Sequence, residues 1–398
     1  MCIRDRFEGG EAKGHNLKLG SNTFIPGFED ALIGSLKGKT TQVRVTFPND
    51  YQVKNLAGKD AVFETKVNEI REDVELKIDK SKFKMAPELV GTAHYINTTP
   101  EQLAKEIDGK VVLYDIWTYS CINCIRTLPH LTAWDEKYSE EGLVIVGIHT
   151  PEFEFEKEYD NVVFATEKFG IKYPVIQDND KETWNEFQNR YWPRKYIADH
   201  EGYIRFDHIG EGAYAETEKV IQLLLEERSV ALGNTLEKKE LVNLDEYKHA
   251  TFRTPELYFG FKFAEGRNQL GNEEGFSKNQ IVTYQLPEKM KQHYFYMEGM
   301  WKNNNDGMKL ISESGKIVLN FNAKQVNIVA SESATLFIEY DGKEIPEEVR
   351  GKDVSPEGTV KISEPRLYNL IDSQLEGPHE IIIQVQNPGF EIFTFTFG

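Results

Sequence analysis

The chain has 398 residues, of which 39% are hydrophobic and 28% are charged, and its net charge at pH 7 is −18. This length predicts two or three domains, and the composition is ordinary for a soluble protein. The negative charge repels phosphate backbones and anionic lipid surfaces, which excludes nucleic acid as a partner.

The first block, residues 1–71, is predicted to be a small β-rich domain. It opens with MCIRDRFEGG, which lacks the apolar core of a signal peptide. TTQVRVTF (40–47) and DAVFETKVNEI (60–70) alternate apolar and polar residues with a period of two, which predicts two strands. The charged stretch that follows, residues 72–85, is predicted to be a linker. No apolar run in the chain is long enough to span a bilayer.

The segment FIPGFEDAL, with FPNDY and AVFETKV after it, resembles the FKBP-type peptidyl-prolyl isomerase domain in its trigger-factor form. The resemblance implies a proline pocket lined by Ile25, Phe28, Tyr51 and Phe63. An apolar aromatic pocket of this kind favours the twisted imide over the planar ground state. The family's opening strand is replaced by MCIRDR, so we expect a truncated domain with weak or no isomerase activity, in which these side chains could serve only as remnant core.

The second block, residues 86–228, alternates strands and helices. KVVLYDIW (110–117) and GLVIVGIHT (142–150) are predicted strands, a helix is predicted after the cysteines, and TEKVIQLLLEERS (217–229) is an amphipathic closing helix. This alternation of strands and helices predicts a sheet covered by helices.

Two of the three cysteines, Cys121 and Cys124, form a C-x-x-C pair at the predicted junction of strand and helix. A structural zinc site would need two further ligands, and there is neither a second C-x-x-C nor a close histidine pair. Two structural core thiols are another possibility. We favour a redox pair: Cys121 at a helix N-terminus would be stabilised as a thiolate, and Cys124, one turn on, could resolve a mixed disulfide.

The surrounding residues resemble the active-site segment of the thioredoxin fold. The resemblance implies that Asp115 helps to move the proton of the resolving cysteine, that Trp117 lies beside the site and that Pro129 kinks the active-site helix. Asp115 could instead be a solvent-facing charge at a strand end. The fold also requires a cis-proline, which Trp192-Pro193 supplies by resemblance, leaving the backbone of residue 192 free to pair with a substrate; the alternative is an ordinary trans-proline.

Several longer segments, WTYSCINCIRTLPHLTAWDEKY, GIHTPEFEFEKEYDNV, YPVIQDND and NRYWPRKYIADHEGYIR, resemble the extracytoplasmic region of DipZ-type redoxins (TlpA-like). This implies an extracytoplasmic thiol–disulfide oxidoreductase that acts on protein thiols or disulfides, with no cofactor beyond a Cys121–Cys124 disulfide. It also suggests a membrane electron donor of the DipZ/CcdA kind.

The pair departs from thioredoxin at Ser120 and at the inner dipeptide Ile122-Asn123, so the redox direction cannot be transferred. His149, Glu152 and Glu154 could face the cysteines or cap the next helix, and we favour capping or a scaffold role. Thr118-x-x-Cys121 matches half of the peroxiredoxin motif, but Tyr114 stands where that motif has proline. Thiol peroxidase activity therefore stays a lesser alternative.

The last block, residues 245–398, consists of short strands and turns, including an Asp341-Gly342 hairpin signal, and predicts a β-sandwich. The DipZ resemblance implies a jelly-roll-like module similar to carbohydrate-binding modules, with a glycan or protein ligand. The aromatics in YFGF (258–261) and HYFYMEGMW (293–301) could form a platform for sugars, but such alternating aromatics are more often core.

We therefore expect a multidomain α+β and α/β protein: a partial FKBP-like domain, a thioredoxin-like three-layer α/β/α domain and an all-β C-terminal domain. The leading function is thiol–disulfide exchange through Cys121 and Cys124, with an attached folding-helper domain, Asp115 and Pro193 assisting and Trp117 and Trp192 beside the substrate. The alternatives are a prolyl isomerase with the redoxin domain as a passenger, and a carbohydrate- or protein-binding module.

Overall fold

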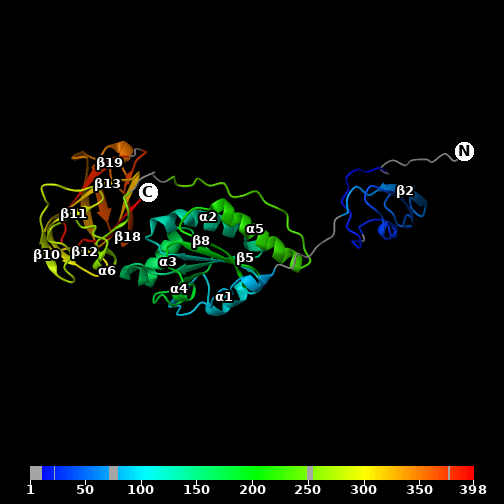
Figure 1. Ribbon diagram of the computed structural model, residues 1–398, viewed down its shortest axis with the longest axis horizontal. Helices are drawn as coiled ribbons and strands as arrows, with labels where there is room; N and C mark the ends of the chain where they lie inside the picture. The colour runs from blue at the N-terminus through cyan, green and yellow to red at the C-terminus, as the bar shows by residue number, and fades with distance from the viewer. Residues whose placement is uncertain (1–10, 22, 71–78, 249–253, 375–376) are drawn as a thin grey trace. The chain divides into compact units, whose positions relative to one another are not determined.

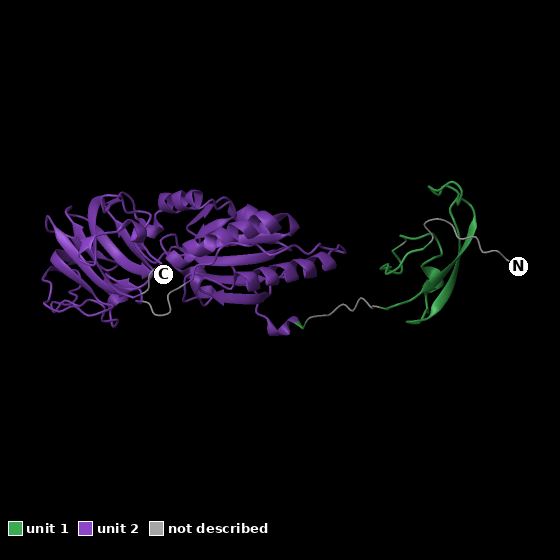
Figure 2. Ribbon diagram, turned by 90° about the horizontal axis from the view of Figure 1, so that it is seen from above, with its two compact units in different colours: residues 1–79 green, residues 80–398 purple. Residues whose placement is uncertain are grey.

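A computed structural model describes residues 11–21, 23–70, 79–248, 254–374 and 377–398. The chain divides into two compact units, Met1–Asp79 and Lys80–Gly398 (Figure 2). No helix in the described part of either unit is both long enough and apolar enough to cross a membrane.

The first unit is built around an antiparallel pair of strands, β1 (Thr40–Thr46) and β2 (Asp60–Lys66), with a short 3-10 helix, η1 (Asp30–Leu32). Val43 and Val45 of β1 are buried while the residues between them are exposed, as the period-two pattern predicted. The first ten residues, which include Cys2, and residues 71–78, which include the first half of the predicted linker, lie outside the described residues.

The second unit begins with an α/β domain, residues 80–231 (Figure 1). Its described strands form one six-stranded sheet in the order β3-β6-β5-β4-β7-β8. The strands are β3 (His94–Ile96), β4 (Val111–Trp117), β5 (Leu143–His149), β6 (Val175–Gln177), β7 (Arg194–Ala198) and β8 (Ile204–Ile209). The helices are η2 (Lys80–Lys82), α1 (Pro100–Ile107), α2 (Ile122–Tyr138), η3 (Ser139–Glu141), η4 (Glu154–Lys157), α3 (Tyr159–Lys168), α4 (Glu182–Glu186) and α5 (Tyr214–Ala231).

The central strand β4 is buried along its whole length because helices cover both faces of the sheet. Its residues Val111, Leu113 and Trp117 share one apolar cluster with side chains of α2, α3 and α5. Val112, Tyr114 and Ile116 share another with side chains of α1 and α4. The predicted three-layer α/β/α arrangement is thereby confirmed. Residues 118–121 connect the carboxyl end of β4 to α2.

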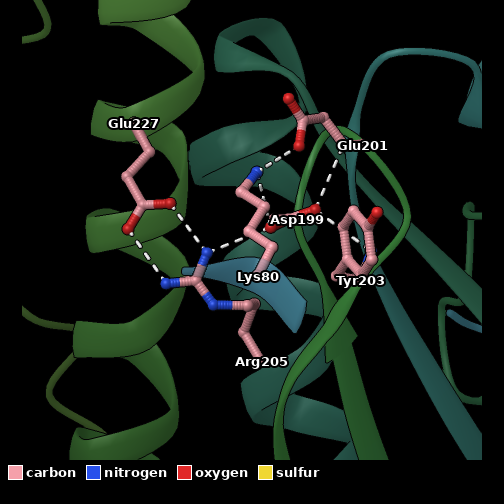
Figure 3. A network of polar contacts seen from close by, with 6 residues as sticks. All are labelled: Lys80, Asp199, Glu201, Tyr203, Arg205 and Glu227. Carbon is pink, nitrogen blue, oxygen red and sulfur yellow. Dashed lines mark hydrogen bonds and ion pairs between the residues drawn. The ribbon is translucent and has the colours of Figure 1, made fainter. Parts of the chain in front are cut away.

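A network of charged side chains anchors the start of this domain (Figure 3). Lys80 pairs with Asp199 at 3.1 Å and with Glu201 at 2.5 Å, and Arg205 joins Asp199 to Glu227 of α5. Burial alone would raise the pKa of Asp199, but hydrogen bonds from Lys80 and Arg205 outweigh burial and lower it. The C-terminal end of the predicted linker is therefore held against the β7–β8 hairpin and α5.

Residues 254–398, called here the β-domain, confirm the predicted all-β region. The described strands are β9 (Leu257–Tyr258), β10 (Ile281–Tyr284), β11 (Phe295–Asn303), β12 (Met308–Leu310), β13 (Gly315–Asn322), β14 (Gln325–Ser331), β15 (Ala334–Tyr340), β16 (Lys343–Glu344), β17 (Thr359–Ile362), β18 (Arg366–Asp372), β19 (Pro378–Val385) and β20 (Glu391–Phe397). They are accompanied by α6 (Phe261–Ala264) and η5 (Glu347–Val349).

These twelve strands form one continuous curled sheet, because β11 changes partners along its length. Its first half, up to Glu298, pairs with β13, and its second half, from Gly299, pairs with β10 and β12. Gly299 has a φ of 105°, a conformation that favours glycine, at this change of partner. Both halves of the sheet contribute to one core.

Several aromatics of the two segments YFGF and HYFYMEGMW are core residues, as favoured from the sequence. Phe259, Phe295 and Trp301 are fully buried, so they do not form an exposed platform for sugars. Asp341 and Gly342 both have positive φ at the β15–β16 turn, which confirms the predicted hairpin.

Candidate active site

Cys121 and Cys124 lie where β4 passes into α2, as predicted. Cys121 is the N-cap residue of α2, and its Sγ accepts a hydrogen bond from the backbone N–H of Cys124 at 3.4 Å. Cys121 is partly exposed, whereas Cys124 is only 1% exposed. The geometry therefore gives Cys121 access to a substrate and keeps Cys124 behind it. The N–H of Cys124, in the first turn of α2, faces the sulfur of Cys121, where it can stabilise a thiolate.

The thiol of Cys124 is held in its protonated form. Burial raises its pKa, a hydrogen bond with Cys121 and the charge of Cys121 add to this, and the charge of Asp115 acts in the same direction. A buried thiol of this kind is a poor nucleophile until a neighbouring group removes its proton.

Asp115 lies on β4 and is buried, so it is not the solvent-facing charge considered as an alternative. Burial raises the pKa of Asp115 to about 7, although Lys195 lowers it. Its Oδ1 has no hydrogen-bond partner among the described residues. A carboxyl group that titrates near neutral pH can both take and return a proton.

Lys195 stands directly opposite Asp115 on β7 and was not singled out in the sequence. It is fully buried, and its Nζ donates to the carbonyl oxygen of Gly210 at 3.1 Å. Burial lowers the pKa of Lys195, while the charges of Asp115 and Cys124 oppose this. The only sequence signal was a lysine two residues after Pro193, directly before the apolar residues Tyr196, Ile197 and Ala198.

The Trp192-Pro193 peptide bond is cis, as predicted. The indole Nε1 of Trp192 donates to the carbonyl oxygen of Thr150 at 2.9 Å, and the Thr150 N–H donates to the carbonyl oxygen of Trp117 at 2.9 Å. The cis-proline loop is thus joined to the carboxyl ends of β5 and β4. Trp192 and Cys121 are both partly buried and pack against the same apolar cluster.

Trp117 was predicted to lie beside the substrate, and this is wrong. Its side chain is fully buried because β4 is covered on both faces, so it supports the site from within the core. His149 lies beside residues 118–121, called here the cysteine loop, which connect β4 to α2. Its Nε2 is 3.4 Å from the Thr118 hydroxyl. Burial lowers the pKa of His149 to about 3, so the ring is neutral. Thr118 is fully buried and directed at His149, which does not support a peroxide pocket at Cys121.

The segment after β5 is organised by a carboxylate that was not singled out in the sequence, Glu156. It is fully buried and accepts hydrogen bonds from the Ser120 hydroxyl at 2.6 Å, Glu152 N–H at 2.6 Å and Phe153 N–H at 3.0 Å. The capping role that we favoured for Glu152 or Glu154 thus belongs to Glu156. Ser120, where thioredoxins usually have tryptophan, is the residue that joins the cysteine loop to this cap.

Glu156→Ala is expected to destabilise the protein by about 3 kcal/mol, because the Ser120 hydroxyl and the N–H groups of Glu152 and Phe153 would each lose their buried acceptor. Glu154→Ala is the matched control, since Glu154 is exposed and its side chain pairs with Lys157 at the surface. The control should cost less than about 1 kcal/mol. Urea unfolding of both variants measures the difference, and equal losses would contradict the assigned role of Glu156.

In the first unit, three of the four predicted pocket residues meet. Ile25, Phe28 and Phe63 belong to one apolar cluster, and the rings of Phe28 and Phe63 lie 5.4 Å apart. Tyr51 packs on Phe47 at 4.7 Å, and Phe47 lies 6.3 Å from Phe63. The residues are gathered on one side of the β1–β2 pair, but Phe28 is mostly buried.

Three family descriptions match parts of the chain: FKBP-type peptidyl-prolyl cis-trans isomerase over residues 4–68, thioredoxin-like over 109–204, and thioredoxin-like C-terminal domain over 254–398. Protein DipZ of Mycobacterium bovis is 32% identical over 317 residues, which is 79% of this chain and 43% of DipZ. The trigger factor of Limosilactobacillus reuteri is 46% identical over 107 residues, which is 27% of this chain and 24% of that protein.

The chain therefore spans less than half of the length of DipZ. Among solved structures, a thioredoxin-like protein in its oxidised form is 28% identical and matches 36% of this chain and 97% of its own, with a TM-score of 0.33. Over most of its length the chain is thus similar to DipZ. The part that matches the thioredoxin-like description carries the cysteine pair; an FKBP-type match precedes it and a match to a thioredoxin-like C-terminal domain follows it.

Proposed function

We propose that this protein is a thiol–disulfide oxidoreductase that acts on protein thiols or disulfides through Cys121 and Cys124. The observation that carries the proposal is the unequal exposure of two cysteines at one helix N-terminus, with a buried carboxyl group, Asp115, whose pKa is raised to about 7. The homology to DipZ and the match to the thioredoxin-like family support it.

In the proposed reaction, the Cys121 thiolate attacks one sulfur of a substrate disulfide, and the other sulfur leaves as a thiolate. Asp115 takes the proton of Cys124, and the Cys124 thiolate then attacks Cys121 Sγ. The substrate's second sulfur leaves, both substrate sulfurs gain protons, and the protein is left with a Cys121–Cys124 disulfide. The backbone beside Pro193 is the proposed binding edge for an extended substrate segment.

Two measurements test this proposal on the full chain. Thiol trapping across a series of glutathione potentials should show Cys121 and Cys124 interconverting between dithiol and disulfide, and insulin-disulfide reduction should give turnover. Unchanged turnover in Cys121→Ser would refute the proposal. The extracytoplasmic location and a membrane electron donor rest on the resemblance to DipZ-type proteins and are proposed with it.

We further infer that the first unit binds proline-containing segments and has at most weak prolyl isomerase activity. The gathered side chains of Ile25, Phe28 and Phe63 and the FKBP-type match support this. Its described sheet has only two strands, and such a sheet gives a pocket little rigid support. A protease-coupled proline-isomerisation assay should show weak activity that Phe28→Ala removes. Strong activity, or activity that survives in Phe28→Ala, would contradict this inference.

A further inference from the structure

The first turn of α2 is packed against the β-domain. Ile122, which directly follows Cys121, is only 8% exposed. It belongs to an apolar cluster, called here the interdomain cluster, that contains Phe153 from the α/β domain. The β-domain contributes Tyr258, Ala264, Val329, Leu367 and Phe393 to the same cluster. Ile122, the first residue of the inner dipeptide of the C-x-x-C pair, is therefore covered by a domain that begins more than one hundred residues later.

One turn further along α2, Arg126 adds polar contacts to the same junction. Its Nη2 donates to Oε1 of Gln325, the first residue of β14, at 2.5 Å. Its Nη1 pairs with Glu211 at 3.2 Å, and its guanidinium lies 3.6 Å from the ring centre of Tyr247. Arg126 is thus held from three directions, which fixes the second turn of the helix.

The β-domain also contacts the segment after β5 that lies beside the cysteine loop. The Tyr258 hydroxyl donates to Glu152 Oε1 at 2.9 Å, and the Glu154 N–H donates to Asp306 Oδ2 at 3.0 Å. The ring of Phe393 lies 5.3 Å from Phe153 and 4.8 Å from Phe155. In this same segment, the Glu156 carboxyl group accepts a hydrogen bond from the Ser120 hydroxyl. The β-domain therefore supports both elements that flank Cys121.

We propose that the β-domain is a structural part of the redox site, and that Ile122 is the positioning residue through which it acts. By burying Ile122, the β-domain holds the first turn of α2 so that the Cys124 N–H faces Cys121 Sγ. This inference rests on the proposed thiol–disulfide exchange. It assigns to the β-domain a role in setting the redox equilibrium, whatever else the β-domain binds.

The direction of the effect follows from the thiolate. A well-held N-terminal turn stabilises the Cys121 thiolate, and stabilising the reduced form makes a cysteine pair more oxidising. Removing the side chain of Ile122 should loosen the turn, destabilise the Cys121 thiolate and favour the disulfide. The equilibrium constant for oxidation of the dithiol by glutathione disulfide, which yields the protein disulfide and two glutathione thiols, should rise about threefold to tenfold.

The experiment compares four variants of the full chain with the wild type. Ile122→Ala removes the contact from α2, and Leu367→Ala weakens the same cluster from β18 without changing α2. Ile122→Val keeps most of the side chain, so its equilibrium constant should match that of the wild type. Ile383→Ala is the matched control, because Ile383 is fully buried in the core of the β-domain and lies outside the interdomain cluster. Glutathione equilibria and the pH dependence of iodoacetamide alkylation are measured for each.

The proposal is supported if Ile122→Ala and Leu367→Ala both shift the equilibrium toward the disulfide and slow the alkylation of Cys121 at pH 7, while Ile383→Ala changes neither. It is overturned if the wild type exchanges with glutathione but Ile122→Ala and Leu367→Ala match it, or if Ile383→Ala shifts the equilibrium equally. A wild-type pair that does not exchange at all would instead overturn the proposed function, so the two failures can be told apart.

Discussion

Cys124→Ser is expected to accumulate as a mixed disulfide with its substrate through Cys121, whereas Cys121→Ser is expected to form none. Cys121 is the partly exposed sulfur and can meet a substrate, but Cys124 is 1% exposed and can meet only Cys121. Turnover should fall at least about 1,000-fold in both variants, since each step needs its own thiolate. The adduct is measured by mass spectrometry after incubation with a disulfide-bonded peptide.

The double variant Cys121→Ser/Cys124→Ser is the control for adducts formed elsewhere on the chain. It should give the same low background as Cys121→Ser alone. An adduct on Cys124 in Cys121→Ser, formed as fast as the one on Cys121 in Cys124→Ser, would mean that the two cysteines are equivalent. The assignment of one attacking and one resolving cysteine would then be wrong.

The sequence predicted the parts of the site that depend on local spacing. Cys121 and Cys124 are separated by one helical turn, so their spacing in the sequence already places the two sulfurs close together. Pro193 directly precedes a strand, which is equally visible in the sequence. The position of Asp115 at the end of an apolar strand was equally visible. Trp117 was misjudged because β4 is covered on both faces, and a strand of this kind has no alternation to tell a core side chain from a surface one.

The missed residues depend on contacts between distant segments. Lys195 faces Asp115 only because β7 pairs with β4 in one particular register. Where strands are buried on both faces, the hydrophobic pattern of the sequence does not determine this register. Glu156 is 36 residues from Ser120, and its role depends on how the segment after β5 folds back. Ile122 was noted as a departure from thioredoxin, but its burial under the β-domain depends on packing between domains.

Asp115→Asn is expected to slow the resolution of the mixed disulfide by about 100-fold at pH 8, because asparagine cannot accept the proton of Cys124. In the wild type, the rate of resolution should rise with pH through a midpoint near 7, where burial places the pKa of Asp115. The variant should lack this rise. Lys195→Met should move the wild-type midpoint upward, because Lys195 lowers the pKa of Asp115. Quenched-flow release of a labelled substrate thiol at pH 6 to 9 measures these rates.

The raised pKa of Asp115 also predicts how the unfolding free energy changes with pH. The contribution of Asp115 should fall as pH rises, whereas that of a paired surface carboxylate rises. The pKa of Asp115 is raised to about 7 in the folded protein, above its value of about 3.9 in an unfolded chain. The protonated carboxyl is therefore favoured by folding at low pH, and this advantage is lost as pH rises through 7. Between pH 4 and 8, Asp115→Asn should gain roughly 3 kcal/mol in unfolding free energy relative to the wild type.

Urea unfolding at several pH values measures this gain, and Asp160→Asn, a change at an exposed residue of α3, is the control that should show no comparable gain. If Asp115→Asn follows the wild type across the whole range, Asp115 does not titrate near neutral pH in the folded protein. It could not then serve as the proton acceptor for Cys124. If the stability gain appears but the rate of resolution is unchanged, the buried carboxyl titrates as described and another group accepts the proton.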